Sequence, residues 1–324
     1  MTTRPRILLT NPMHEAVQAD YAHRVDLVVA PDTSADTLRR LVADADGVIV
    51  RSLLPDDIFE HAPRLRAVVR HGVGLDMIPV ERATDRGIPV ANLPGSNTQS
   101  VVEYCLAAML HFRRPLAKID MGLRSEGWGP ARAMSNSATE LARTVCGIVG
   151  VGAIGGGVAR MAQHLGMRVF GLTRDPSRLP EHVTPKTRDE LFAESDVVVL
   201  CCPLTSQTRH LVDASAIERM KPTAVLINVA RGPVVDTAAV IKALHEGRLA
   251  GAALDVHDHH PLRGDEPIFD APRLLLTPHV AAVTESSMRV MSEGSVDLMT
   301  ALLAGRRHPN VCNPEVFDRP RIQP

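Results

Sequence analysis

Residues 144–155 read TVCGIVGVGAIG, and this stretch decides the fold of the chain. The apolar, β-branched run 144–149 predicts a buried strand, and residues 154–165 have the apolar spacing of an amphipathic helix. The glycines therefore lie at a direct turn from strand to helix. A strand that passes through such a turn into a helix is typical of a doubly wound parallel sheet.

The glycines of this turn have the spacing G-x-G-x-x-G. Gly150 allows the tight turn, Gly152 lets the backbone approach a pyrophosphate, and Gly155 lets the helix pack on the strand. The N-H groups at the start of the helix point at the anion, so we expect Ala153 and Ile154 to join the glycines in binding a dinucleotide. A purely structural glycine-rich turn is the alternative, and the strand-turn-helix context favours the dinucleotide.

Short strands and helical segments alternate outward from this unit over almost the whole chain. We expect strands at 6–10, 47–51, 67–70, 168–173, 197–201, 224–228, 251–254 and 274–277. We expect the longer helices at 36–43, 98–121, 236–246 and 284–304. The helix 98–121 leads through a loop, 122–136, into the second series of strands, which indicates a domain boundary near residue 98. The pattern predicts the α/β class with two doubly wound parallel-sheet domains, since 324 residues exceed what one core usually fills.

The composition excludes several classes of protein. With 45% apolar residues, 23% charged residues and a formal net charge of -1, neither a disordered nor a nucleic-acid-binding protein is expected. No apolar run approaches the ~18 residues of a membrane span, and the N-terminus lacks the apolar core of a signal peptide. Five cysteines without C-x-x-C spacing are typical of buried thiols in a reducing compartment. We therefore expect a cytoplasmic protein with no nucleic-acid or membrane partner.

The residues after the strand that follows the glycine turn bear on the choice of cofactor. Residues 173–178 read TRDPSR, so Thr173 stands where NAD-binding proteins carry an acidic residue for the ribose. Thr173, Arg174 and Arg178 instead offer a hydroxyl and two guanidinium groups to a 2′-phosphate. This favours NADP. NAD remains possible if Asp175 takes the ribose.

Further motifs follow in a fixed order. They are HGVGLD at 71–76, RGIPV at 86–90, SDVVVL at 195–200, PLT at 203–205, INVARG at 227–232, GAALDV at 251–256 and TPH at 277–279. Together with the glycine turn, this set closely resembles the D-isomer-specific 2-hydroxyacid dehydrogenases. The resemblance covers nearly the whole chain, and the ordered set is far more specific than any single motif.

The resemblance implies a domain plan that the sequence pattern alone does not establish. Residues 1–97 and 290–324 would form a flavodoxin-like substrate-binding domain. Residues 98–289 would form a Rossmann-type dinucleotide-binding domain inserted in it, with the active site in the cleft. The family is commonly homodimeric, so a second copy of the chain is the expected partner besides a small 2-oxoacid or 2-hydroxyacid.

The resemblance also implies roles for single residues. Arg231 would bind the carboxylate and carbonyl of the substrate, and His279 would exchange a proton with the substrate oxygen. Backbone N-H groups of Val73 and Gly74 would hold the carboxylate, while Asp255 would orient the nicotinamide carboxamide. Hydride delivery to a 2-oxoacid requires a fixed cation and a proton donor, which agrees with these residue types.

Other positions complete the expected sites. Arg51 and Ser52 lie on a loop that the resemblance places on the substrate side, and Pro203, Thr208 and Val229 would contact the cofactor. Taken singly, Arg231 and His279 also allow structural interpretations, an ion pair beside a turn and a histidine bonded to backbone. Their joint position in the ordered set favours catalysis.

The chain departs from the family at one catalytic position. The family has a Glu five residues after the Asp of the LDV motif, where it bonds the catalytic histidine, whereas residues 255–261 here read DVHDHHP and place His260 there. A second imidazole cannot raise the pKa of His279 as a carboxylate does, and a charged one would lower it. Formate dehydrogenase-like relatives use a neutral Gln at this position. We therefore expect His260 to be a neutral hydrogen-bonding partner, with oxoacid reduction falling off at lower pH than in carboxylate-containing relatives.

Alternatives for this stretch remain open. Asp258 or Glu266 could supply the missing carboxylate after a rearrangement of the loop. Consecutive His and Asp residues lack the spacing of known zinc sites, so we expect no metal. A third possibility is a dinucleotide-sensing regulator that has lost catalysis, as in the corepressor members of the family.

Substrate identity is weakly encoded. 3-Phosphoglycerate dehydrogenases tend to carry a further basic residue where Leu53 stands, and they often append a regulatory domain for which this length leaves no room. We therefore expect NADPH-dependent reduction of glyoxylate, hydroxypyruvate or a bulkier analogue. NAD-dependent oxidation of a 2-hydroxyacid such as 3-phosphoglycerate is the alternative enzyme activity.

Overall fold

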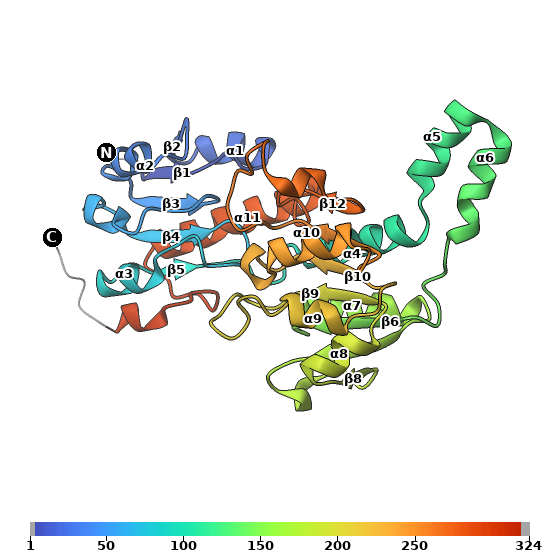
Figure 1. The fold of residues 1–324 in the computed structure, drawn as a ribbon. Coiled ribbons are helices and arrows are strands. Elements are labelled where there is room, and N and C mark those ends of the chain that lie inside the picture. Colours follow the sequence, from blue (N-terminus) through green and yellow to red (C-terminus); the bar gives the residue numbers. More distant parts are fainter. Residues whose placement is uncertain (1–3, 319–324) are drawn as a thin grey trace. The chain divides into compact units, whose positions relative to one another are not determined.

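The chain folds into two compact α/β units, which the computed structural model describes over residues 4–318 (Figure 1). The terminal unit consists of the residues up to Asn97 and from Val283 onward, and the central unit is Thr98–Ala282. Each unit has a parallel sheet with helices on both faces, which confirms the predicted α/β class with two doubly wound domains. Helix α11 (Glu285–Leu303) lies wholly in the terminal unit, so the chain returns to this unit before the helix rather than near residue 290.

The sheet of the terminal unit has five parallel strands in the order β2-β1-β3-β4-β5. Their bounds are β1 Arg6–Leu9, β2 Asp26–Val29, β3 Gly47–Val50, β4 Ala67–Arg70 and β5 Val90–Ala91. The order reverses direction between β1 and β3. Ligands of doubly wound sheets bind outside the carboxyl ends of the strands at such a reversal.

Helices cover both faces of the terminal sheet. They are α1 Glu15–Ala22, α2 Ala35–Val42, α3 Val80–Asp85 and α11. Ile7 and Leu9 of β1 pack in the core formed with α1 and α11, whereas Leu8 packs in the opposite core with α2 and α3. Because successive side chains of a strand point to opposite faces, a strand covered on both sides needs an uninterrupted apolar run.

The sheet of the central unit has seven parallel strands in the order β12-β11-β10-β9-β6-β7-β8. Their bounds are β6 Val145–Val149, β7 Arg168–Leu172, β8 Val183–Pro185, β9 Val197–Leu200, β10 Val225–Asn228, β11 Gly251–Leu254 and β12 Leu274–Leu276. The order reverses between β6 and β9. The glycine turn that follows β6 therefore lies at the reversal, where the doubly wound fold binds its ligand.

Two layers of helices enclose the central sheet. They are α4 Thr98–Arg113, α7 Ala153–His164, α8 Arg188–Glu194, α9 Ala214–Arg219 and α10 Thr237–His245. Helices α4 and α7 cover one face, and α8, α9 and α10 cover the other. A Cβ on Gly157 would lie 2.6 Å from the side chain of Val102, so glycine lets α4 and α7 cross closely. No helix between residues 4 and 318 combines the length and apolarity needed to cross a membrane.

Short 3-10 helices complete the fold. They are η1 Ile58–His61, η2 Met134–Ser137, η3 Pro176–Arg178, η4 Gly232–Val234, η5 Pro267–Asp270 and η6 Pro314–Phe317.

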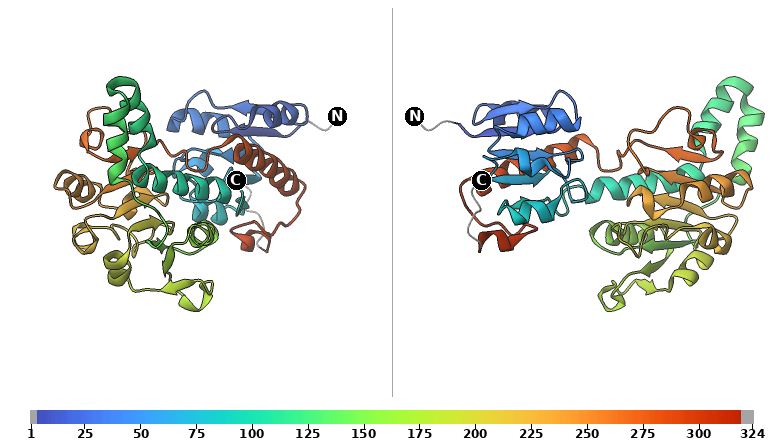
Figure 2. Two further views of the ribbon diagram at one scale, coloured as in Figure 1. Left: turned by 90° about the vertical axis from the view of Figure 1, so that its right-hand side faces the viewer. Right: turned by 60° about the vertical axis from the view of Figure 1, so that its left-hand side comes forward.

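A helical hairpin replaces the long helix and loop that the sequence predicts at 98–136. Helix α4 ends at Arg113, and α5 (Leu116–Glu126) and α6 (Trp128–Ala133) follow as an antiparallel pair (Figure 2). Pro115, which lacks an N-H, separates α4 from α5, and Gly127 turns the chain with a φ of 84°. The exposed apolar side chains of the hairpin are Leu116, Met121, Leu123 and Trp128.

Candidate active site

The glycine turn connects β6 to α7. Gly150 has a φ of 88°, and a Cβ there would lie 2.8 Å from the backbone of Cys202, so both conformation and space favour glycine. A Cβ on Gly155 would collide with the carbonyl oxygen of Gly150. A Cβ on Gly152 would meet nothing within 4 Å. The packing of the protein therefore requires glycine at 150 and 155, while the open space at Gly152 suits the close approach of a ligand.

The N-terminus of α7 is suited to an anion. Gly152 occupies the N-cap, and within the described chain no side chain caps the helix and no acidic residue lies in its first turn. The first-turn N-H groups of Ala153, Ile154 and Gly155 thus present the positive end of the helix dipole. The pyrophosphate of a dinucleotide fits this end in charge and in the space beside Gly152.

Three predicted cofactor residues, Thr173, Arg174 and Arg178, follow β7. Asp175 lies among them, but its carboxylate caps η3 by accepting hydrogen bonds from the N-H of Ser177 at 3.1 Å and from its hydroxyl at 2.6 Å. The side chains of Arg174 and Arg178 are exposed and have no hydrogen bond or ion pair within residues 4–318. Arg174 and Arg178 are cations without a partner in the described chain, whereas the Asp175 carboxylate already accepts hydrogen bonds from Ser177. This arrangement favours a 2′-phosphate over a bare ribose.

The remaining predicted cofactor residues lie at the carboxyl ends of β9 and β10. The Thr208 hydroxyl donates to the carbonyl of Pro203 at 2.7 Å and accepts from the N-H of Thr205 at 2.7 Å, which closes the loop after β9. The N-H of Val229 donates to the last carbonyl of β9. These loops leave the same edge of the sheet as the glycine turn.

Asp255, which follows β11, fastens the segment that carries His279. Its carboxylate is 1% exposed and accepts from the hydroxyl of Thr277 at 2.6 Å and from the N-H groups of Val280 at 2.8 Å and Ala281 at 2.9 Å. Its backbone carbonyl accepts from the N-H of His279 at 2.8 Å. His279 has a φ of 57°, a conformation that a non-glycine residue keeps only where its surroundings impose it. Asp255 imposes it here.

Arg231 lies on the loop after β10, which a buried amide holds in place. The Asn228 side chain accepts from the N-H of Ala230 at 3.0 Å and donates to the carbonyl of Arg231 at 3.0 Å. A Cβ on Gly232 would collide with the backbone of His257, so glycine lets the loops after β10 and β11 touch. This contact brings Arg231 toward the histidines of the neighbouring loop.

Two of those histidines, His257 and His260, form a row with His279, which follows β12. The ring centroids of His257 and His260 lie 5.9 Å apart, and those of His260 and His279 lie 5.6 Å apart with nearly parallel rings. His257 is 7% exposed, and its Nε2 lies 2.9 Å from the carbonyl oxygen of Thr277. Within residues 4–318, no group of three or more His, Cys, Asp and Glu side chains is placed to hold a metal ion.

His260 is surrounded mostly by groups that disfavour its charged form. Partial burial lowers the pKa of His260 below its usual value, and repulsion from His257, His259 and Arg231 lowers it further. Asp255 acts in the opposite direction.

The two carboxylates considered as replacements for the missing Glu have other partners. Asp258 accepts from the hydroxyl of Thr237 at 3.0 Å. Glu266 lies 2.9 Å from Nε2 of His259 and also accepts from a backbone N-H. The ring that packs beside His279 is that of His260.

The predicted carboxylate-binding loop of the terminal unit follows β4. The Arg70 guanidinium donates to the carbonyls of Gly74 at 3.0 Å and His71 at 2.8 Å and to the last carbonyl of β3 at 2.9 Å. Asn92 donates to the carbonyl of Val73 at 2.7 Å. The N-H groups of Val73 and Gly74 have no hydrogen-bond partner within residues 4–318. The loop is held through its carbonyls, which leaves these two donors for a ligand.

Arg51 and Ser52 follow β3 in the same unit. The Thr10 hydroxyl accepts from both of their N-H groups, at 2.8 Å and 3.1 Å. The Arg51 guanidinium donates to the carbonyl of Pro12 and contacts the sulfur of Met288, and burial lowers its pKa. The hydroxyl of Ser52 is buried without a hydrogen-bond partner in the described chain. Ser52 is therefore free to bind a ligand, whereas Arg51 already binds the protein.

Several residues that hold the sites were missed by the sequence interpretation. They are polar residues within or next to strand ends, namely Thr10, Arg70, Asn228, His257 and Thr277. Tyr104 also belongs to this set, because its hydroxyl lies 2.7 Å from that of Thr277 and burial raises its pKa to about 12. A polar residue at the end of an otherwise apolar strand is the signal that could have found most of them.

Comparison with known proteins identifies the family. Residues 106–281 match the NAD-binding domain of the D-isomer specific 2-hydroxyacid dehydrogenases. A glyoxylate reductase from Korarchaeum cryptofilum is 34% identical over 325 residues, which cover 97% of each chain. A glyoxylate reductase from Pyrococcus furiosus is 36% identical over 291 residues, which cover 87% of this chain and 86% of that one.

A solved structure agrees with these relatives. The NADPH-dependent glyoxylate/hydroxypyruvate reductase from Sinorhizobium meliloti, in complex with NADP and malonate, matches with a TM-score of 0.85 at 29% identity. The match covers 99% of this chain and 100% of that chain. The resemblance drawn from the motifs is thereby confirmed. The chain belongs to the D-isomer-specific 2-hydroxyacid dehydrogenase family and is an NAD(P)-dependent oxidoreductase.

Proposed function

We propose that this dehydrogenase reduces glyoxylate, hydroxypyruvate or a similar small 2-oxoacid with NADPH. The names of the relatives support the substrate class, and the two unpaired guanidinium groups after β7 support the cofactor. The observation that carries the proposal is the packing of the His260 ring beside that of His279 at the carboxyl edge of the central sheet, together with the contact between the loop of Arg231 and the loop of His257 at Gly232. The glycine turn leaves that same edge.

The chemistry assigns a task to each group. When bound, the cofactor supplies a hydride to the carbonyl carbon of the 2-oxoacid. Negative charge then develops on the carbonyl oxygen, and the Arg231 guanidinium stabilises it while binding the adjacent carboxylate. His279, as an imidazolium, gives its proton to that oxygen, and a 2-hydroxyacid results. Reduction therefore needs His279 protonated, and oxidation needs it neutral.

His260 takes the position of the usual carboxylate as a neutral partner of His279. Its ring packs beside that of His279, and its surroundings disfavour a charge on it. A neutral neighbour can accept a hydrogen bond from the imidazolium but does not raise the pKa of His279 as a carboxylate does. Asp255 positions His279 through the backbone, because its carbonyl accepts from the N-H of His279, and it would also orient the nicotinamide carboxamide.

The residues that would hold the cofactor lie in the central unit, residues 98–282. Gly150, Gly152, Ala153, Ile154 and Gly155 would bind the pyrophosphate. Thr173, Arg174 and Arg178 would bind the 2′-phosphate, and the loops with Pro203, Thr208 and Val229 would contact the remainder of the dinucleotide.

The terminal unit, residues 1–97 and 283–324, binds the substrate. The N-H groups of Val73 and Gly74 and the hydroxyl of Ser52 hold the carboxylate of the substrate, and the Arg51 guanidinium adds positive charge. Leu53 is 67% exposed where a phosphorylated substrate needs a cation, which supports a small unphosphorylated oxoacid.

The proposal is tested by following NADPH and NADH consumption against a panel of 2-oxoacids and 3-phosphohydroxypyruvate. We expect turnover of glyoxylate or hydroxypyruvate with a higher kcat/KM for NADPH. Equal or better rates with NADH would overturn the cofactor assignment. Tight NADPH binding without turnover of any oxoacid would replace the enzyme with a dinucleotide-sensing regulator.

The assembly is a homodimer that uses the α5-α6 hairpin. Leu116 and Met121 are each 64% exposed, and Trp128 is 72% exposed, on a hairpin whose two helices pack mainly on each other. A patch of large apolar side chains on one element is typical of a protein interface. Sedimentation should give a dimer, and Trp128→Glu should shift it toward monomer.

The odd number of cysteines, all free thiols, supports a cytoplasmic location.

A further inference from the structure

We infer that His257 is a positioning residue that fixes the tautomer of His260 and, through it, the protonation of His279. The inference rests on the proposed function, in which His279 gives its proton to the oxoacid. The three rings form a row in the central unit, with centroid separations of 5.9 Å and 5.6 Å. Rings at these separations overlap little, so they meet at their edges, which carry both carbon and nitrogen atoms.

The tautomer of His257 is set by the backbone. Its Nε2 lies 2.9 Å from the carbonyl oxygen of Thr277, and a carbonyl can only accept, so Nε2 carries the hydrogen. In the neutral ring, Nδ1 is then a bare acceptor. This Nδ1 is buried and has no hydrogen-bond partner within residues 4–318. A buried acceptor without a donor is costly, and the adjacent ring of His260 has an N-H to give.

A neutral imidazole has one hydrogen-bond donor and one acceptor, and this limits how His260 can bond to its two neighbours. When its N-H goes to His257, its other nitrogen is bare and meets His279 as an acceptor. An imidazolium has two N-H groups, so His279 can give one to His260 and aim the other at the substrate. In the opposite tautomer, His260 would present its N-H to His279 and hold that ring unprotonated, which removes the proton donor.

The charged surroundings keep His260 in the neutral form that this arrangement needs. The titratable and charged groups near it are His257, His259 and His279, with Arg231 from the loop after β10 and Asp255 from the end of β11. His257, His259 and Arg231 oppose a positive charge on His260, and Asp255 favours one. The buried Asp255 carboxylate already accepts three hydrogen bonds from the His279 segment, which reduces its pull.

Two substitutions of His257 test the roles of its two ring nitrogens separately. His257→Gln places an amide NH2 near the position of Nε2, which keeps the bond to Thr277 and removes the acceptor at Nδ1. His257→Asn places an amide near Nδ1 and removes the bond to Thr277. We expect His257→Gln to lower kcat by about tenfold or more with little change in KM, and His257→Asn to retain more activity. The reverse order would mean that His257 only fastens Thr277, which would overturn the inference.

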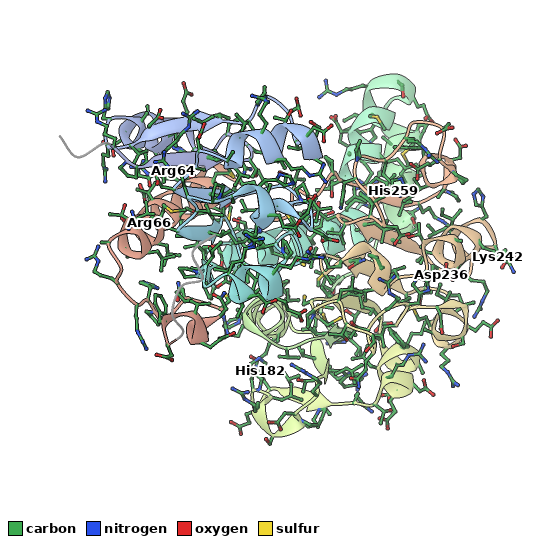
Figure 3. All side chains as sticks on the ribbon, turned by 90° about the vertical axis from the view of Figure 1, so that its left-hand side faces the viewer. Arg64, Arg66, His182, Asp236, Lys242 and His259 are labelled. Carbon is green, nitrogen blue, oxygen red and sulfur yellow. The ribbon has the colours of Figure 1, made fainter. Side chains whose placement is uncertain are left out.

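A second background gives an independent test. A carboxylate has no tautomer, so in His260→Glu the further change His257→Gln should lose much less kcat than it does in the wild type. Equal fold losses in both backgrounds would contradict the inference. His259→Gln is the matched control, because it removes an exposed imidazole of the same loop that binds Glu266 (Figure 3). It should lower kcat much less than His257→Gln does.

Ring 15N spectra of histidine-labelled protein give a readout that does not depend on turnover. They should show His257 neutral with its hydrogen on Nε2, and His257→Gln should change the tautomer signals of His260. Unchanged His260 signals would overturn the inference. The spectra need no substrate. A protein inactive on every oxoacid would therefore refute the proposed function, and the spectra would still test whether His257 sets the tautomer of His260.

Discussion

The glycine turn after β6 and the histidine loop after β11 lie at the same edge of one sheet but follow different rules. In the turn, Gly150 and Gly155 are required by backbone sterics, because a Cβ at either position would strike another backbone. In the loop, the ring centroids of His257 and His260 lie 5.9 Å apart, and the hydrogens on the ring nitrogens depend on their neighbours. The first site is determined by shape, and the second is determined by protonation.

This difference shows where one chain can depart from its family. The turn tolerates no side chain at Gly150 or Gly155, so its glycine spacing between a strand and a helix identifies it. The loop can exchange a carboxylate for an imidazole if another group supplies the orientation. Here we assign that orientation to His257.

The largest expected effect tests the chemical half of the comparison. His279→Gln removes the proton donor and should lower kcat for oxoacid reduction by about hundredfold or more. The dissociation constant of NADPH, measured by fluorescence titration, should stay unchanged, since the glycine turn is untouched. A kcat within tenfold of the wild type would remove His279 from the mechanism.

A matched pair of glycine substitutions tests the steric half. Gly155→Ala forces a Cβ against the carbonyl of Gly150 and should lower the free energy of unfolding by about 1–3 kcal/mol. Gly152→Ala has room in the protein and should leave Tm unchanged while weakening NADPH binding. Thermal unfolding and NADPH titration of both variants decide the point, and an equal loss of Tm in the two would contradict the assigned roles.

A smaller effect concerns the choice between the two dinucleotides. The double variant Arg174→Ala with Arg178→Ala removes two cations without other partners and should raise the KM for NADPH about tenfold. The KM for NADH should change little, because NADH lacks the 2′-phosphate. An equal rise in KM for NADPH and NADH would show that these arginines do not bind the 2′-phosphate.

Much of the fold could be predicted because buried parallel strands are continuous apolar runs. The strands that the sequence did not reveal are β2, β5 and β8, which lie at sheet edges. Strands β2 and β8 are only partly buried, so their apolar pattern is weaker than in the central strands. The predicted helix 98–121 failed at Pro115, where ring sterics outweigh the apolar spacing around it.

The site residues divide in the same way. The glycine turn is local, so its spacing was sufficient to find it. Arg70 holds the loop 71–74 through a carbonyl of β3 twenty residues away, and Tyr104 reaches Thr277 across 173 residues. Contacts of this kind exist only after the strands are paired, and no local sequence pattern predicts them. The position of His260 was visible, but its dependence on His257 needed the distance between the rings.

The pH dependence of glyoxylate reduction tests the central claim most directly. Reduction needs protonated His279, so kcat/KM is lost as pH rises through the pKa of His279. A carboxylate at position 260 would raise that pKa and move the loss to higher pH. We predict that His260→Glu shifts the descending limb of the kcat/KM profile upward by about 1 pH unit or more relative to the wild type. Superimposable profiles for the two proteins would contradict the account.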